Sequence, residues 1–266
     1  MARLPVVADK FYPGDPTELR QQIAGFVSTD EPGKPAAAVM VPHAGYVYSG
    51  KIAGETFAQV EIPETVILIG PNHQGYGAPV SLGTEDWAMP MGSVPFAVDV
   101  AAALLQNSSV IVSDNSAHQY EHSLEVEIPF LQFFQPRLSI VPLVVSHISY
   151  KKCQQVARDL ALAISFYDGP VLLVASSDMT HYESREDAEP KDHLALEYLL
   201  KMDPEGLYNT VVTNRISMCG VIPATITLLV AREIGSTGAE LIRYTDSGEV
   251  SGDTSQVVGY AGVVIR

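Results

Sequence analysis

The sequence has few cysteines and few basic residues, and each shortage excludes a class of protein. Only two of the 266 residues are cysteines, Cys153 and Cys219, so a disulfide framework is not expected. Lysine and arginine number 16 against 31 acidic residues, which gives a formal net charge of −15, and no basic run is longer than Lys151–Lys152. Because nucleic-acid binding depends on clustered basic side chains, DNA and RNA are not expected partners.

Long apolar runs are also missing. No stretch approaches the roughly 18 consecutive apolar residues of a membrane span, and the first residues, MARLPVVADKFYPGD, contain no apolar run of signal-peptide length. Internal repeats, low-complexity tracts and long linkers are absent as well. The hydrophobic fraction of 47% and the mean hydropathy of +0.13 indicate a large core. We therefore expect a cytoplasmic protein with one domain over residues 1–266 and no membrane contact.

What the sequence does contain is an alternation of short apolar runs with helical patterns. Nearly continuous apolar runs predict buried strands at Ala37–Val41, Thr65–Ile69, Ser139–Val145 and Val171–Ala175. Helical periodicity predicts helices near Gly50–Gln59, Val98–Gln106, Leu124–Phe134, Tyr150–Phe166, Ala188–Lys201 and Ala224–Ile234. A C-terminal pair of strands is expected at Glu240–Arg243 and Val257–Ile265. The pattern predicts an α/β fold with a central, mostly parallel sheet flanked by helices.

Histidines follow all four expected central strands. His43 comes after the first strand, Asn72 and His73 after the second, His147 after the third, and the segment from Asp178 to His181 after the fourth. Ligands of open α/β sheets bind beyond the carboxyl ends of the strands, where the connecting loops converge. We therefore expect His43, His73, Asp178 and His181 to face one pocket.

Cys219 lies just before the expected helix Ala224–Ile234, whose first turn would hold Pro223. A helix N-terminus favours a thiolate, so Cys219 is a candidate ligand or nucleophile. Cys153, inside the helix Tyr150–Phe166, is interpreted as packing.

Three further residues have two interpretations each. Asp178 can act with His181 as an acid and base or serve only as a helix cap. His122, preceded by Glu121, can face the pocket or belong to a helix start. Tyr46 can line a pocket or pack in the core.

Five segments together resemble the Memo family in order and spacing. They are VPHAGYVYSG (Val41–Gly50), LIGPNHQGYG (Leu68–Gly77), EHSLEVEIPFLQ (Glu121–Gln132), SSDMTHY (Ser176–Tyr182) and MCG (Met218–Gly220). The microbial members are known as the B component of a system with an AMMECR-like protein and a radical SAM protein. The resemblance covers nearly the whole chain and implies those two proteins as partners.

The resemblance also implies the fold of the class III extradiol dioxygenases, which bind iron(II) through two histidines and a carboxylate. The matching positions here are His43 and His73, with Cys219 in place of the carboxylate, and His181 with Asp178 near the position of the catalytic base. A set of two histidines and one cysteine is softer than the iron set, and suits iron or copper, with zinc possible.

The leading hypothesis is a metal-dependent redox protein or oxidoreductase in which His181 acts as acid and base and is oriented by Asp178. The expected substrate contacts are Asn72, His122 and Tyr46, and the ligand is a small molecule or a peptide. Two alternatives are a non-catalytic module that recognises a peptide or partner protein, and a hydrolase with Cys219 as nucleophile.

Overall fold

The computed structural model describes residues 2–27 and 31–266, and its centre is a nine-stranded sheet. Four parallel strands form the middle of the sheet in the order β1-β8-β2-β7. These strands are β1 (Ala38–Val41), β8 (Val171–Ser176), β2 (Thr65–Pro71) and β7 (Ser139–Val145). All four are almost completely buried, which explains why their sequences are apolar without alternation.

The strands on either side of this centre make the sheet mixed. On one side β11 (Val257–Ile265) pairs antiparallel with β1 and with β10 (Ala239–Asp246), and β9 (His181–Glu183) pairs with β11. On the other side β3 (Val80–Leu82) pairs antiparallel with β7 and parallel with β6 (Val112–Ser113). A separate hairpin consists of β4 (Trp87–Met89) and β5 (Gly92–Val94).

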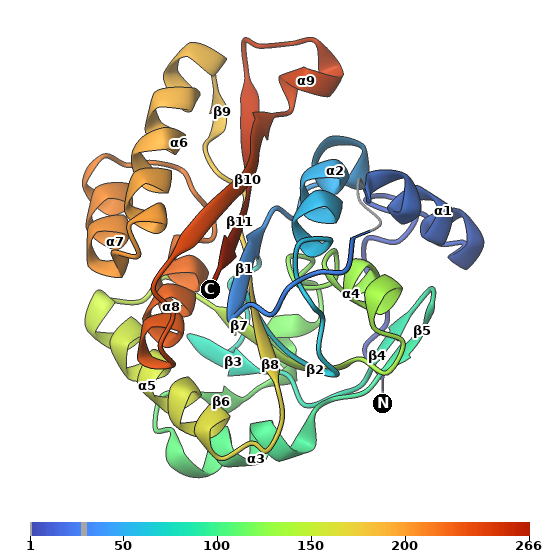
Figure 1. The fold of residues 1–266 in the computed structure, drawn as a ribbon, viewed down its shortest axis with the longest axis vertical. Coiled ribbons are helices and arrows are strands. Elements are labelled where there is room, and N and C mark those ends of the chain that lie inside the picture. Colours follow the sequence, from blue (N-terminus) through green and yellow to red (C-terminus); the bar gives the residue numbers. More distant parts are fainter. Residues whose placement is uncertain (1, 28–30) are drawn as a thin grey trace.

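Helices cover both faces of the sheet. Alternate residues of β1 illustrate this arrangement, because Ala38 and Met40 pack in one hydrophobic cluster and Val39 and Val41 in the other. The first cluster is closed by α3 (Val98–Asn107), α5 (Tyr150–Ser165), α6 (Arg185–Leu200), α7 (Pro204–Thr213) and α8 (Val221–Glu233). The second is closed by α1 (Pro16–Phe26), α2 (Tyr46–Phe57) and α4 (Ile128–Phe134), which lie together in Figure 1. The described residues also include two short helices, η1 (Asn115–His118) and α9 (Gly248–Ser251).

The expected α/β fold with a mostly parallel centre is confirmed, and the four expected central strands are present within two residues of their expected ends. The C-terminal pair is also present, but β11 lies inside the sheet between β10 and β1. The expected helix start at Leu124 was wrong, since α4 begins only at Ile128. No helix of the described chain is long and apolar enough to cross a membrane.

Because β1, β2, β7 and β8 are parallel, their carboxyl ends lie along one edge of the sheet. The segments that follow them begin with Pro42, Asn72, Ser146 and Ser177. This edge carries the candidate site.

Candidate metal centre

Three histidines converge at the carboxyl edge of the sheet. His43 follows β1, His73 follows β2, and His122 lies on the segment before α4. One ring nitrogen from each lies within 4.8 Å of the other two. The ring centroids of His73 and His122 are 4.8 Å apart, and that of His43 is 5.2 Å from His73 and 5.6 Å from His122. The cluster therefore has the residue type and spacing of a metal site.

Glu121 holds two of these histidines. Its carboxylate accepts hydrogen bonds from the ring Nδ1 of His73 at 2.9 Å and from the backbone N–H groups of His73, His122 and Ser123. Nδ1 of His122 lies 3.5 Å from the same carboxylate. Burial opposes ionisation of Glu121, but His73 and the backbone donors outweigh it and lower the pKa to about 2. Because Nδ1 of His73 donates to this carboxylate, its Nε2 is free to bind an ion.

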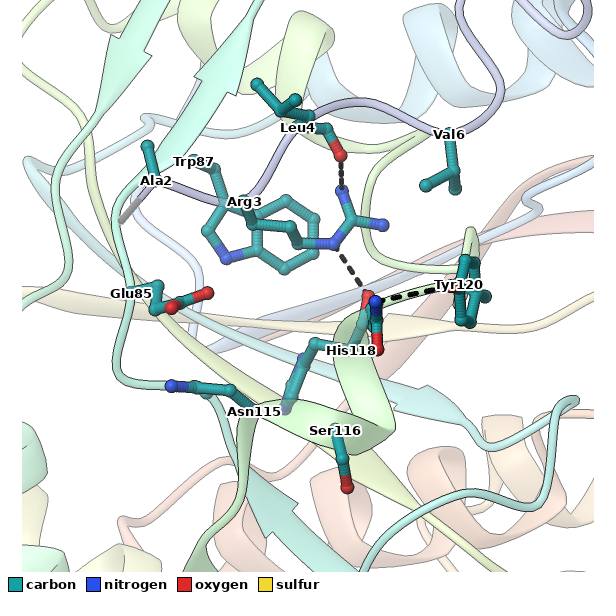
Figure 2. A pocket seen from close by; sticks show the side chains of 12 residues that line it. Ala2, Arg3, Leu4, Val6, Glu85, Trp87, Asn115, Ser116, His118 and Tyr120 are labelled. Carbon is teal, nitrogen blue, oxygen red and sulfur yellow. Dashed lines mark hydrogen bonds between the residues drawn. The ribbon is translucent and has the colours of Figure 1, made fainter.

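Arg3 anchors the segment that carries Glu121. Its guanidinium donates to the backbone carbonyls of Glu121 and His118 and forms an ion pair with Glu125. Figure 2 shows Arg3 over the ring of Trp87, 3.9 Å from the ring centroid. The sequence contains no signal for this contact, because more than a hundred residues separate the partners.

Ser176, the last residue of β8, orients His43. Its Oγ lies 2.8 Å from Nδ1 of His43, 2.7 Å from the carbonyl of Ser123 and 2.8 Å from Oε1 of Glu127. The carbonyl of Ser123 can only accept, so the single hydroxyl hydrogen of Ser176 points to it and an oxygen lone pair faces His43. Nδ1 of His43 must then donate, which leaves its Nε2 as the ligand atom. Burial lowers the pKa of His43, and a neutral imidazole is the form that binds metals.

Cys219 lies beside the cluster, with its Sγ 3.4 Å from Nε2 of His43. A close approach between Gly220 and the end of β8 places it there, since a side chain on Gly220 would lie 2.3 Å from Cβ of Ser177. Burial and the charge of Asp178 raise the pKa of the Cys219 thiol well above its usual value. In the metal-free site these two effects oppose the thiolate that was expected at the helix N-terminus. A thiol also makes a poor nucleophile.

Asp178 and His181 adjoin the cluster. Asp178 accepts the backbone N–H of His43 at 2.8 Å, and its Oδ2 lies 4.0 Å from Nε2 of the same residue. Burial raises the pKa of Asp178 to about 6, although nearby His181 acts in the opposite direction. Nδ1 of His181 lies 2.9 Å from the carbonyl of Ser217, which can only accept, so Nδ1 carries a proton and Nε2 is free.

A cavity of about 500 Å³ opens beside the histidines, and its wall includes Asn72, His73 and Cys219. His43, Asp178 and His181 were expected to face the same pocket as His73, but they are not among the described residues that line this cavity. The side chain of Asn72 donates to Ser146 and to the carbonyl of Tyr76. Tyr46 was expected to contact a substrate, but the structure places it elsewhere. Its hydroxyl donates to the carbonyl of Val126 and its ring packs 4.7 Å from Phe130 in the core.

The donor chemistry fits a transition metal. Imidazole and thiol groups suit zinc, copper and iron, whereas magnesium and calcium prefer oxygen. His43 and His73 each bond a protein acceptor through Nδ1 and leave Nε2 free, as metal-binding histidines do. His122 was expected to contact substrate, and its nearness to the other two rings indicates a further nitrogen donor.

Replacing Glu121 by Gln is expected to lower metal affinity about 10- to 100-fold, because an amide cannot accept four hydrogen bonds and orients His73 poorly. Competition titration against a chelator measures this loss. Asp246→Asn is the matched control, since Asp246 is also a buried carboxylate and its hydrogen-bond donors, Arg185 and Gly248, contact none of the three rings. Both variants should lose stability, by about 1–3 kcal/mol. Equal metal affinity in the two variants would contradict the orienting role of Glu121.

Comparison with known proteins gives one consistent result. The family model described as "Memo-like protein" matches residues 3–264. A MEMO1 family protein of Aquifex aeolicus is 40% identical, with 98% of each chain covered, and one of Methanopyrus kandleri is 37% identical, with 100% of this chain and 99% of the relative covered. The crystal structure of an uncharacterized protein from Escherichia coli K12 matches with a TM-score of 0.57 at 14% identity, over 85% of this chain and 98% of the other, and this likeness concerns the fold alone.

Proposed function

Since this chain belongs to the Memo family, we propose that it is a metal-binding redox protein whose ion is iron or copper. His43, His73 and His122 supply nitrogen donors, and Cys219 supplies a softer fourth donor on the side of His43. The observation that carries the proposal is the convergence of three ring nitrogens within 4.8 Å at the carboxyl edge of the sheet. A bound iron or copper ion would supply electron transfer with dioxygen or a small substrate.

The chain's own residues would supply binding and proton transfer. The cavity beside Asn72 and Cys219 would hold the substrate next to the histidines. His181 is the proposed acid and base, because its Nε2 is free while Ser217 holds its Nδ1. Asp178 contributes a buried carboxyl group with a pKa of about 6. This pKa is close enough to neutral pH for the group to gain and lose a proton during a reaction.

Metal analysis of protein purified without an affinity tag tests the proposal most directly. We expect iron or copper in equimolar amount with the chain, and oxygen consumption when the loaded protein receives a suitable reductant. Absence of bound transition metal would contradict the proposal. Full metal occupancy without turnover under any condition would favour the alternative of a binding module.

Replacing His181 by Ala separates metal binding from proton transfer. Metal affinity should change little, because Ser217 and not the ion holds the His181 ring. Oxygen-dependent turnover should fall by about 100-fold or more, which is the usual contribution of a general acid or base. His193→Ala is the control, since His193 is an exposed residue of α6 beside Glu189. A loss of metal in His181→Ala equal to that in His43→Ala would make His181 a ligand.

A further inference from the structure

We infer that the cavity beside the histidine cluster binds a small organic acid, with one anionic group and an apolar body. Only the reaction of the bound acid rests on the proposed function. The choice of ligand depends on the residues that line the cavity. That wall contains an arginine without a carboxylate partner, an apolar side and an unused hydrogen-bond donor.

The charge of the wall is opposite to that of the protein. The chain has 31 acidic residues and a net charge of −15, yet no Asp or Glu is found among the lining residues within the part of the chain that the structure describes. Arg215 supplies the permanent charge of this wall. In so acidic a protein, a guanidinium with no carboxylate in the same wall attracts small anions and repels cations.

Arg215 is available to a ligand. It follows α7 in a left-handed conformation with a φ of 53°, held by a hydrogen bond from its backbone N–H to the carbonyl of Val212. Within residues 2–27 and 31–266, no carboxylate lies at ion-pair distance from its guanidinium. A guanidinium with free donors is suited to a carboxylate, which it binds through two parallel hydrogen bonds.

A second cavity of similar size provides a comparison, because its arginine is already bonded to other groups of the protein. It lies around the N-terminal segment and is also lined by an arginine, Arg3. Figure 2 shows that guanidinium bonded to backbone carbonyls and lying over Trp87, with Glu85 in the same wall. Arg3 has protein partners for its charge, including the ion pair with Glu125. The cavity at Arg215 is therefore the better anion site.

The rest of the cavity wall has an apolar side and a polar side. The apolar side comes from the end of α7, the loop after it and the start of α8, and consists of Val211, Val212, Ile216, Met218, Val221 and Ile222. The polar side follows β2 and β7. There the Oγ of Ser146 accepts from Asn72, so the Ser146 hydroxyl hydrogen remains available to a ligand oxygen. Ligand cavities of about 300–1,000 Å³ with such a mixture hold small organic molecules.

Three probes with one six-carbon chain test the inference: hexanoate, 1-hexanol and hexylamine. Binding is measured by titration calorimetry, on metal-loaded protein and on the same protein stripped with a chelator. Hexanoate should bind about 10-fold more tightly than hexanol, and hexylamine more weakly than either. This order should persist in the stripped protein, where a carboxylate has no ion to ligate.

Variants of the cavity wall test whether Arg215 is responsible for the preference for hexanoate. Arg215→Gln should remove the preference for hexanoate, a loss of about 10-fold, and leave hexanol binding unchanged. Arg215→Lys should keep part of the preference, and Val212→Ser should weaken both probes equally. Arg137→Gln is the matched control, because Arg137 is an exposed arginine paired with Glu64. Thermal unfolding of each variant checks that it remains folded.

The outcomes separate this inference from the proposed function. Hexanoate binding no tighter than hexanol in the stripped protein, or unchanged by Arg215→Gln, overturns the inference even if metal binds as proposed. Failure to bind any transition metal overturns the proposed function. Selective, Arg215-dependent binding of hexanoate by that same metal-free protein would still support an organic-acid site.

Discussion

Replacing His43 by Ala is expected to lower the affinity for iron or copper by more than about 100-fold, because the partners that merely orient a ligand are worth about 10- to 100-fold. His43 is buried at the carboxyl end of β1, and its Nε2 lies 3.4 Å from Sγ of Cys219. His73→Ala should have a comparable effect. Affinity is measured by competition with a chelator of known strength, and bound metal by elemental analysis.

The matched control for these two variants is His193→Ala, which removes an exposed imidazole on α6. It should leave metal affinity unchanged. Metal should also raise the unfolding temperature of the parent protein and of His193→Ala but not of His43→Ala, because only a protein that binds the ion is stabilised by it. A His43→Ala protein that still gains stability from the metal would show that the three-histidine cluster is not the site.

The part of this site that could be predicted from the sequence is the part built on the central strands. Continuous apolar runs identified β1, β2, β7 and β8, and their parallel arrangement alone brings His43, His73 and Asp178 to one edge. Gly220 explains the placement of Cys219, yet only the structure shows how closely Gly220 approaches Ser177.

The segment from Glu121 to Glu127 could not be predicted in the same way. Ser123, Glu125 and Glu127 resemble a helix start, but their partners are distant in sequence. Glu125 accepts hydrogen bonds from the N-terminal segment, and Glu127 lies buried beneath Ser176. These long-range contacts keep the segment out of a regular helix and turn His122 toward the other two histidines. Local propensity contains no information about them.

Tyr46 illustrates a second limit. It lies three residues after His43, so a pocket position and a core position were equally compatible with the sequence. Helix α2 begins at Tyr46, and the start of this helix directs the ring toward Phe130 and not toward the cavity. Which way a side chain points at a helix start depends on the helix axis, and that axis is set by packing.

Replacing Cys219 by Ser is expected to reduce copper(I) affinity by about 100-fold and to reduce affinity for zinc and iron(II) less, because a thiolate is the soft donor of the set and the three imidazoles remain. The Sγ lies 3.4 Å from Nε2 of His43, so the same ion can contact both atoms after small movements. Competition titrations with the three ions measure the change in preference.

Cys153→Ser is the matched control. It changes the other cysteine of the chain, which is buried in α5, and it should cost stability without altering metal preference. Cys219→Asp supplies a hard donor instead and should shift preference from copper(I) toward iron(II). The added carboxylate would lie beside Asp178, whose backbone N–H now contacts Cys219, so metal-free Cys219→Asp should be less stable than the parent. If Cys219→Ser instead binds all three ions as tightly as the parent, Cys219 is not a ligand, and His43, His73 and His122 hold the ion without it.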